Sequence, residues 1–359
     1  MSQQRVNMPQ YAQKQVQEQS HLVFGAGLIG CYLGGVLSAR GLNVQLVCRA
    51  TMQQKLLAGL QLSDYLGHKT RVSTTRLFTY QTQQNYDFIW LTVKCTGITQ
   101  ALLDMQNYLG SHTVILCCQN GLGSEALVKQ AFPNNLILRV MVPFNVVELK
   151  PGHFHRGSQG QLTIESILGN ENLTQSLVSL LNGDLLPVAG CEKMSALLWA
   201  KLQLNLGNCV NALADIPVKA MLEQRDYRLV IAKLMQELLL VTQALGIVLP
   251  KVTAVPASWI PSILRLPNFL FKRVANSMLA IDPSVRTSMW WDVSQGKPTE
   301  IDYLNGAIVE QGQRLNIACP ANHTLVQIIK ALSEDEQDNA NRPPMAASKL
   351  LNLLNNRPK

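Results

Sequence analysis

Three closely spaced glycines are the first residues of this chain that could support chemistry. Gly25, Gly27 and Gly30 follow an apolar run at 22–24 with the spacing Gly-x-Gly-x-x-Gly, and a helical run begins at Cys31. In that setting the first glycine permits a tight turn, the second lets the backbone approach a pyrophosphate, and the third lets helix and strand pack closely. The helix N-terminus then faces the phosphates. The residues predicted to hold a dinucleotide here are Gly25, Ala26, Gly27, Leu28, Ile29 and Gly30.

The end of the second predicted strand indicates which dinucleotide is bound. Sites for NAD place an Asp or Glu about 20 residues beyond the glycines, where it bonds the ribose 2′-hydroxyl. Here the strand at 44–47 is followed by Cys48 and Arg49, with no carboxylate nearby. A guanidinium pairs well with a 2′-phosphate, so NADPH/NADP+ is favoured as the cofactor over NAD(H). The alternative is that Arg49 is an ordinary solvated arginine at the surface.

Two polar residues follow later strands. Lys94 stands at the end of the strand at 88–93, where it could reach a cofactor or an anionic substrate, or simply be a solvated loop lysine. Asn120 follows the strand at 113–117, and its amide could hydrogen-bond cofactor or substrate with both ends. The sequence Asn120-Gly121 is equally consistent with a plain turn.

A lysine lies within an otherwise apolar helical run at 199–205. Lys201 and Asn205 are four residues apart and project from one helical face, and Asn208 lies beside that face. A lysine in apolar surroundings calls for an acidic partner or a shifted proton affinity. The alternative is a lysine whose ammonium reaches solvent at the helix surface.

A further pair of motifs contains Ser288, in the run Arg286-Thr-Ser-Met, and Glu300, in the run Thr299-Glu-Ile-Asp. Thr299 and Glu300 resemble the opening of a helix at 300–315. A carboxylate at a helix N-terminus also complements the helix dipole, which would explain Glu300 without any chemistry.

The order of the strands and helices that must position these residues predicts an α/β fold. It consists of an N-terminal Rossmann doubly wound sheet followed by an all-helical C-terminal domain. From these patterns we expect a disordered N-terminal tail at 1–20, a dinucleotide-binding domain at 21–190, a helical catalytic domain at 191–335 and a loosely ordered tail at 336–359. Proline-rich residues 247–285 interrupt the helices. The predicted strands are 22–24, 44–47, 88–93, 113–117, 136–142 and 161–164, and the predicted helices are 194–214, 226–246, 300–315 and 322–333.

Composition is that of a globular protein with a large core. Hydrophobic residues make up 47% and charged residues 15% of the 359 residues, with a formal charge of +8. The basic excess suits anionic small ligands, and the lack of a compact basic block argues against nucleic acid. The eight cysteines lack metal-site spacing, so we expect no bound metal, and free thiols favour a cytoplasmic location. The apolar residues 229–249 contain Lys233 and Glu237, which favours a core helix over a membrane span.

Taken together, the motifs resemble the ketopantoate reductase family (2-dehydropantoate 2-reductase). They occur in the family's order and cover about residues 20–330. The matching elements are the glycine run at 25–30, Arg49, Val93-Lys94, Gln119-Asn120-Gly121, Trp199-x-Lys201-Leu202-x-x-Asn205, Ser288-Met289 and Thr299-Glu300-Ile301-Asp302.

This resemblance implies NADPH-dependent reduction of a small 2-keto acid, typically ketopantoate in pantothenate and coenzyme A biosynthesis, with Lys201 as general acid and Glu300 as its supporting carboxylate. It also implies substrate binding by Asn120, Asn205 and Ser288, with Asn208 a further candidate, and contacts of Lys94, Asn120 and Glu300 with the cofactor. Hydride arriving at a ketone carbon builds negative charge on oxygen, which a lysine ammonium can neutralise and protonate.

One position departs from the family pattern. A second asparagine usual in the family falls at Cys209, and either Asn208 or Asn211 could replace it. This leaves open an alternative, a reductase of another bulky 2-keto acid. A non-catalytic NADP-binding sensor is a third hypothesis, although a sensor has no need of Lys201 and Glu300. A homodimer is possible, since the helical domain offers apolar surface.

Overall fold

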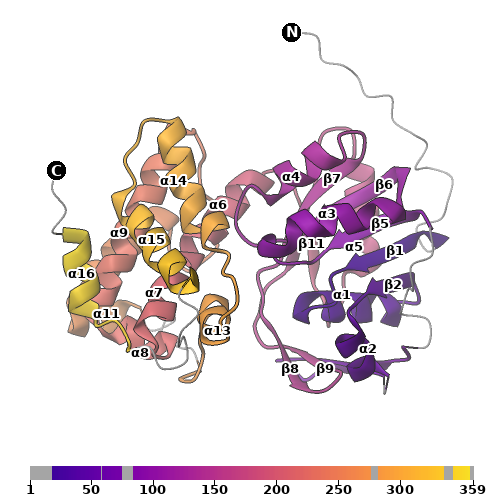
Figure 1. Ribbon diagram of the computed structural model, residues 1–359, viewed down its shortest axis with the longest axis horizontal. Coiled ribbons are helices and arrows are strands. Elements are labelled where there is room, and N and C mark those ends of the chain that lie inside the picture. The colour runs from indigo at the N-terminus through magenta and orange to yellow at the C-terminus, as the bar shows by residue number, and fades with distance from the viewer. Residues whose placement is uncertain (1–17, 58, 75–83, 276–281, 335–342, 356–359) are drawn as a thin grey trace, which may run out of the picture. The chain divides into compact units, whose positions relative to one another are not determined.

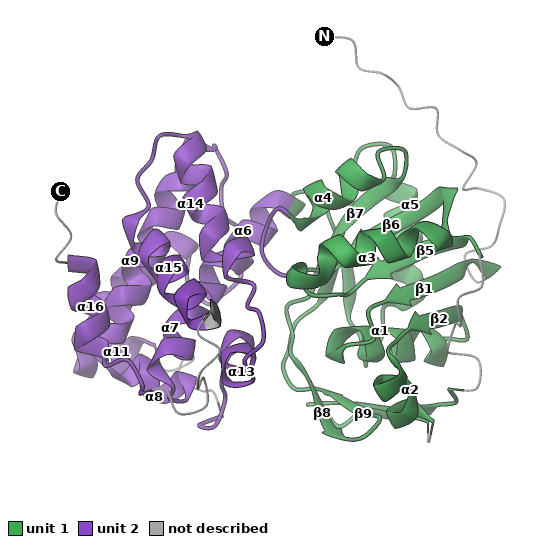
Figure 2. Cartoon of the chain, in the orientation of Figure 1, with its two compact units in different colours: residues 1–119, 124–194 green, residues 120–123, 195–359 purple. Residues whose placement is uncertain are grey.

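The computed structural model describes residues 18–57, 59–74, 84–275, 282–334 and 343–355. The chain forms two compact units, shown in different colours in Figure 2: residues 1–119 and 124–194, and residues 120–123 and 195–359. Most of the predicted N-terminal tail, residues 1–17, lies outside the described residues. Gln19, at its end, is buried, and the first strand begins at Ser20.

Unit 1 is built on a seven-stranded sheet with the order β11-β10-β7-β6-β5-β1-β2. Its strands are parallel except where β10 meets β7 antiparallel. The chain runs from β1 outward to β2 and later returns to β5 on the other side of β1, which makes β1 the point where ligands bind in such sheets. The strands are β1 (Ser20–Phe24), β2 (Asn43–Val47), β5 (Tyr86–Leu91), β6 (Leu109–Cys117), β7 (Leu136–Met141), β10 (Leu162–Glu165) and β11 (Val188–Cys191).

The central strands are apolar along their whole length because both faces of the sheet are covered. In β1, Val23 points into one core cluster while Leu22 and Phe24 point into the other. Figure 1 shows α1 and α3 on this unit's sheet. Its helices are α1 (Leu28–Ala39), α2 (Ala50–Leu56), α3 (Ile98–Met105), α4 (Ser124–Ala131) and α5 (Glu171–Leu181), with 3₁₀ turns η2 (Cys95–Gly97) and η3 (Gln106–Tyr108).

Unit 1 also contains a four-stranded sheet that the sequence did not predict. Its order is β4-β3-β9-β8, and α1 packs on it so closely that a Cβ at Gly35 would lie 2.3 Å from the Leu60 side chain. The four strands are short and mix polar with apolar residues, so no strong alternation marks them. They are β3 (Leu60–Asp64), β4 (Lys69–Val72), β8 (Val146–Lys150) and β9 (His153–Arg156).

A buried ion pair joins β3 to β9 in this second sheet. Arg156 Nη2 donates to Asp64 Oδ2 at 3.0 Å, and both side chains are almost fully buried. Asp64 also accepts hydrogen bonds from the backbone of Leu66 and from the ring and backbone of His68. Burial alone would raise the pKa of Asp64, but the hydrogen bonds from His68 and Arg156 outweigh it and lower the pKa to about 2.

Replacing Asp64 by Asn should therefore lower the free energy of unfolding by about 3 to 5 kcal/mol, because Arg156 would keep a buried charge without a counter-charge. The depressed carboxylate pKa stabilises the fold above its unfolded value of 3.8, so this advantage over the variant should disappear as pH falls from about 4 to 2. Urea unfolding of both proteins across pH measures this, with Asp104→Asn, at an exposed position of α3, as control. An equal loss in the control, or none in Asp64→Asn, would contradict the ion-pair account.

Unit 2 is helical in its described part, with one apolar core. The predicted helix at 194–214 is broken at Leu206, where Gly207 starts a new helix. The predicted helix at 300–315 begins only at Asn305, after a 3₁₀ turn. The elements are α6 (Met194–Asn205), α7 (Gly207–Ala214), α8 (Val218–Glu223), α9 (Arg225–Ala244), η4 (Ala257–Trp259), α10 (Ile260–Arg265), α11 (Asn268–Val274), α13 (Ser288–Ser294), η5 (Ile301–Tyr303), α14 (Asn305–Arg314), α15 (Pro320–Glu334) and α16 (Ala347–Asn355).

The prediction of a loosely ordered tail at 336–359 is wrong for α16. Leu350 is fully buried, and the chain just before this helix is fixed by a hydrogen bond from Met345 N to Leu213 O. Tyr227 on α9 donates from its hydroxyl to Met345 O at 2.8 Å. Leucines three and four residues apart give α16 an apolar face, which outweighs the polar composition around it. Among the described residues, no helix is long and apolar enough to cross a membrane.

Candidate active site

The glycine turn after β1 has the geometry that its sequence predicts. Gly25 has a φ of +113°, which L side chains rarely adopt, and a Cβ there would lie 2.7 Å from Val93 N. A Cβ at Gly30 would lie 2.0 Å from Gly25 O, so α1 can start this close to the strand only with glycine. Thr92 Oγ1 donates to Gly25 O at 2.7 Å and ties the turn to the chain after β5.

Gly27 differs from its two neighbours because nothing lies within 4 Å of where its Cβ would be. It is the N-cap of α1, yet no side chain caps the helix and the first turn contains no acidic residue. The first N–H groups of a helix have no partner within the helix and attract anions. An open surface beside these N–H groups fits the pyrophosphate of a dinucleotide.

Arg49 and Lys94 follow strands that flank β1. Arg49 is exposed at the N-cap of α2, where its carbonyl accepts hydrogen bonds from Met52 N and Gln53 N. Lys94 is exposed after β5. Because β2, β1 and β5 are adjacent and parallel, Arg49, the glycine turn and Lys94 all follow the same edge of the sheet. This edge could hold an extended, anionic dinucleotide.

In unit 2 the structure places Lys201 against Asn120. Lys201 lies on α6, half-buried, and its Nζ donates to Asn120 Oδ1 at 2.6 Å. Asn120 belongs to the short segment 120–123 that packs with the helical unit. An ammonium has three donors, so the contact with Asn120 leaves two for other acceptors. These two candidates lie 81 positions apart in the chain, and the fold brings them into contact.

The segment that carries Asn120 is held in place by the backbone of Tyr303. Leu122 N donates to Tyr303 O at 2.9 Å, and a Cβ at Gly121 would lie only 2.1 Å from that oxygen. Gly121 has a φ of +84°, so glycine suits this position both because of the left-handed backbone and because Tyr303 O lies so close. We refer to this contact of Gly121 and Leu122 with Tyr303 as the Tyr303 latch. Sequence reasoning missed it because a main-chain carbonyl leaves no residue-type signal.

Glu300 begins the same turn that ends at Tyr303. It is buried, is the N-cap of η5, and its carbonyl accepts hydrogen bonds from Tyr303 N and Leu304 N. The latch therefore connects the Glu300 turn to the segment that carries Asn120, the partner of Lys201. Glu300 thus begins a 3₁₀ turn, and the α-helix predicted to start here begins only at Asn305.

Three further candidates, Asn205, Asn208 and Ser288, offer amide and hydroxyl groups. Asn205 ends α6 and Asn208 lies in the first turn of α7, both partly exposed. Thr287 Oγ1 lies 3.4 Å from Asn208 O, which places Ser288, the exposed first residue of α13, near Asn208. These side chains could hold the carboxylate or hydroxyl of a small substrate.

The two asparagines that could replace the one missing at Cys209 lie in different surroundings. Asn211 is fully buried: its Nδ2 donates to Ile216 O at 2.7 Å, and its Oδ1 accepts from Thr287 N and Thr287 Oγ1. Asn211 therefore holds α7 to the start of α13 and is buried, whereas Asn208 is partly exposed. Cys209 is itself buried, and burial raises the pKa of its thiol to about 12.

A buried row of hydrogen-bonded polar side chains fixes the start of α14, next to the Glu300 turn. Sequence reasoning also missed this row. Asn305 Nδ2 donates to Asn322 Oδ1 at 2.9 Å, and Asn322 Nδ2 donates to Glu237 Oε2 at 2.7 Å. Glu237 also accepts from Ala321 N and Asn322 N at the start of α15. Burial raises the pKa of Glu237, although these hydrogen bonds oppose it. Three helices are joined by this row.

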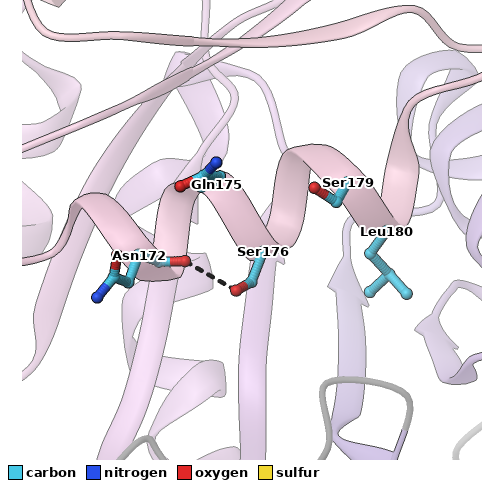
Figure 3. Close-up of a pocket in the computed structure, with 5 residues that line it drawn as sticks. All are labelled: Asn172, Gln175, Ser176, Ser179 and Leu180. Atoms are coloured by element: carbon cyan, nitrogen blue, oxygen red, sulfur yellow. Dashed lines mark hydrogen bonds between the residues drawn. The ribbon is translucent and has the colours of Figure 1, made fainter.

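A surface hollow on α5 in unit 1 has a different character. Figure 3 shows that it is lined by one face of the helix, where Ser176 Oγ donates to Asn172 O at 2.8 Å. The remaining lining residues are Gln175, Ser179 and Leu180. It contains no ionisable group and none of the candidate residues, so it offers no chemistry of the kind described above.

The sequence profiles of one protein family match both parts of the chain. Ketopantoate reductase PanE/ApbA matches residues 21–169, and ketopantoate reductase PanE/ApbA C terminal matches residues 193–333. The chain belongs to the ketopantoate reductase family. The resemblance predicted from the motifs is thereby confirmed, as is the predicted fold. The family consists of nicotinamide-dinucleotide-dependent oxidoreductases that act on CH–OH groups.

Individual relatives support the same family. A 2-dehydropantoate 2-reductase of Streptococcus pyogenes serotype M6 is 26% identical over 256 residues, covering 69% of this chain and 76% of the relative. The crystal structure of a PanE/ApbA family ketopantoate reductase from Ralstonia eutropha has a TM-score of 0.73 at 27% identity, covering 89% of this chain and all of the other.

Two more distant structures share the fold. D-mandelate dehydrogenase, in a ternary structure with NADH and anilino(oxo)acetate, has a TM-score of 0.71 at 21% identity and covers 88% of this chain and 98% of its own. A ketopantoate reductase of Staphylococcus aureus, described as dimeric, has a TM-score of 0.68 at 17% identity, covering 88% of this chain and 99% of its own.

Proposed function

We propose that this protein reduces ketopantoate (2-dehydropantoate) to pantoate with NADPH, a step of pantothenate and coenzyme A biosynthesis. The observation that carries the proposal is the 2.6 Å contact of Lys201 Nζ with Asn120 Oδ1, on a segment held by the Glu300–Tyr303 turn. A non-catalytic sensor of NADP would not need this arrangement. The relatives named 2-dehydropantoate 2-reductase support the choice of substrate.

Each residue has a definite role in this proposal. Bound NADPH would supply the hydride. Lys201 acts as general acid: its ammonium faces the carbonyl oxygen, stabilises the negative charge that develops there, and donates a proton. Asn120 accepts one ammonium hydrogen and so orients the other two. Glu300 supports the charged form of Lys201 from the turn that holds the Asn120 segment.

The remaining candidates bind and orient. Asn205, Asn208 and Ser288 hold the carboxylate and hydroxyl groups of the substrate through amide and hydroxyl hydrogen bonds. In unit 1, residues 25–30 and the N-terminus of α1 hold the pyrophosphate, and Lys94 contacts the nicotinamide end of the cofactor. Asn120 is a further cofactor contact in this proposal. Arg49 pairs with the 2′-phosphate that distinguishes NADPH from NADH.

The variant Arg49→Asp should weaken NADPH binding by about 10- to 100-fold and leave NADH binding nearly unchanged, because only NADPH carries the 2′-phosphate that pairs with the guanidinium. Fluorescence titration with both dinucleotides measures this, and Lys129→Asp, at an exposed position of α4, controls for the change of net charge. Equal losses for NADPH and NADH would refute the assignment of Arg49.

A second candidate function is the reduction of another bulky 2-keto acid. The observation in its favour is the buried Cys209, which removes one amide of the family pattern, and a structural neighbour is a mandelate dehydrogenase. Comparing kcat/KM for ketopantoate with a panel of 2-keto acids that includes an aromatic one separates the two. A higher value for another acid would transfer the assignment to that substrate.

For the assembled protein we propose a homodimer, in keeping with the Staphylococcus aureus relative described as dimeric.

A further inference from the structure

Helix α11 in unit 2 presents an unusual outward face. Three of its apolar residues are exposed: Phe269 at 72%, Val274 at 55% and Leu270 at 38%. The helix is attached to the unit by Phe271, which is fully buried, and by Ala275 just after it. Large apolar side chains grouped on a surface helix indicate a surface that another molecule covers.

Arg228 of α9 attaches α10 and α11 to the core of the unit, so the exposed apolar residues of α11 do not belong to a loosely attached loop. The buried guanidinium donates to the carbonyls of Leu264 and Leu266 at 3.1 and 2.8 Å. It also lies 4.1 Å from the centroid of the Phe271 ring. With a fourth contact, from Nη2 to Asn268 Oδ1, this one buried cation fixes α10 and α11 in place.

Arg228 also shows what lies beside the start of α11. Its Nη1 donates to Leu222 O at 2.8 Å and its Nη2 to Asn268 Oδ1 at 2.9 Å, so the end of α8 adjoins the first residue of α11. Figure 1 shows α8 and α11 as neighbours in this unit. Glu223, the exposed last residue of α8, therefore lies at the N-terminal end of α11.

The opposite end of α11 is basic. Lys272 and Arg273 are exposed in its last turn, about 6 Å along the axis from Asn268. Within the described part of the chain, Glu223, Lys272 and Arg273 form no salt bridge. The α11 surface, defined as Glu223, Phe269, Leu270, Lys272, Arg273 and Val274, thus carries an acidic end, an apolar middle and a basic end.

We propose that the α11 surface is the contact between two copies of this chain, with the two α11 helices antiparallel about a two-fold axis near Leu270. A surface that pairs with itself in this way must be self-complementary. The antiparallel arrangement brings Glu223 of each copy to Lys272 and Arg273 of the other and buries the apolar middle on both sides. An anionic lipid surface fits less well, because Glu223 would face its negative headgroups.

A stable dimer buries about 800 Å² on each partner, so we expect the interface to extend beyond these side chains. Trp259, 62% exposed in η4, is a further exposed apolar residue of this unit. The inference rests on the homodimer of the proposed function and names its surface. The test measures the oligomeric state of the protein and not its activity. A failure of the proposed interface can therefore be told apart from a failure of the proposed reductase activity.

The experiment is light scattering after size exclusion, over a dilution series of the full chain. The wild-type protein is expected to dimerise, and Leu270→Glu to shift it to monomer. Glu223→Lys alone and Lys272→Glu with Arg273→Glu alone should each raise the dissociation constant by about tenfold or more, and combining all three should restore the dimer. Leu168→Glu, at a 97% exposed position in unit 1, is the matched control and should stay dimeric.

If the single reversals lost the dimer only because they fold poorly, combining them would not restore it. Far-UV circular dichroism checks that each variant is folded. A wild-type protein that is monomeric at every concentration overturns the proposal, including the case in which it binds anionic vesicles instead. A Leu270→Glu protein that remains dimeric, or a combined variant no better than the single reversals, overturns it as well.

Discussion

Lys201→Ala should lower kcat for ketopantoate reduction by about 10²- to 10⁴-fold, the range that removal of a general acid usually costs. Without the ammonium, nothing at this position neutralises or protonates the carbonyl oxygen as hydride arrives. NADPH binding should change little, because the residues proposed to hold its phosphates and ribose, Gly25 to Gly30 and Arg49, lie in unit 1. Steady-state kinetics and NADPH titration of the same preparation separate these two expectations.

Lys251→Ala is the matched control for this experiment. Lys251 is an exposed lysine of the same unit, and its loss should leave kcat within about twofold of wild type. If Lys201→Ala retained near-normal turnover, Lys201 would have no part in proton transfer and the proposed mechanism would fail.

Gly121→Ala should have the second-largest effect on turnover. A methyl group at this position would meet Tyr303 O at 2.1 Å, so the Tyr303 latch cannot close and Asn120 must move away from Lys201. A displacement of about 1 Å of a positioning group can cost about 10²-fold in rate, and we expect a loss of kcat/KM of that order. NADPH-dependent turnover and thermal unfolding of the variant are measured together.

Gly123→Ala provides a close control for the backbone contribution. Gly123 also has a positive φ, +94°, but nothing lies within 4 Å of its Cβ position. Both variants therefore incur the left-handed strain of about 1 to 2 kcal/mol, and only Gly121→Ala adds the clash with Tyr303. Equal losses of activity in the two variants would show that backbone strain, and not the latch, determines turnover.

The parts of the fold that could be predicted are those in which residue type and spacing reflect the structure directly. The glycine run at 25–30 is one, because φ and close approach require glycine at two of its positions. The apolar strands 22–24 and 88–93 are another, because burial on both faces of the sheet demands continuous apolar residues. Lys201 could be singled out because a cation within an otherwise apolar helix calls for a specific partner.

Other features depend on contacts that residue types do not reveal. The Tyr303 latch uses a main-chain carbonyl, and the strands of the second sheet are short and mix polar with apolar residues. Asn211 and Asn208 are indistinguishable in sequence. In the structure Asn211 is buried and hydrogen-bonded to Thr287 and Ile216, whereas Asn208 is partly exposed. Helix α16 was missed because its apolar face is short and surrounded by polar residues.

The measurement that tests the central claim most directly is NADPH oxidation by the purified wild-type protein in the presence of ketopantoate, with pantoate quantified as product. The account predicts one pantoate formed for each NADPH consumed, and a higher kcat/KM with NADPH than with NADH. No oxidation of NADPH with ketopantoate or with any acid of the 2-keto acid panel would contradict the proposal that Lys201 and Asn120 form the active site of a keto-acid reductase.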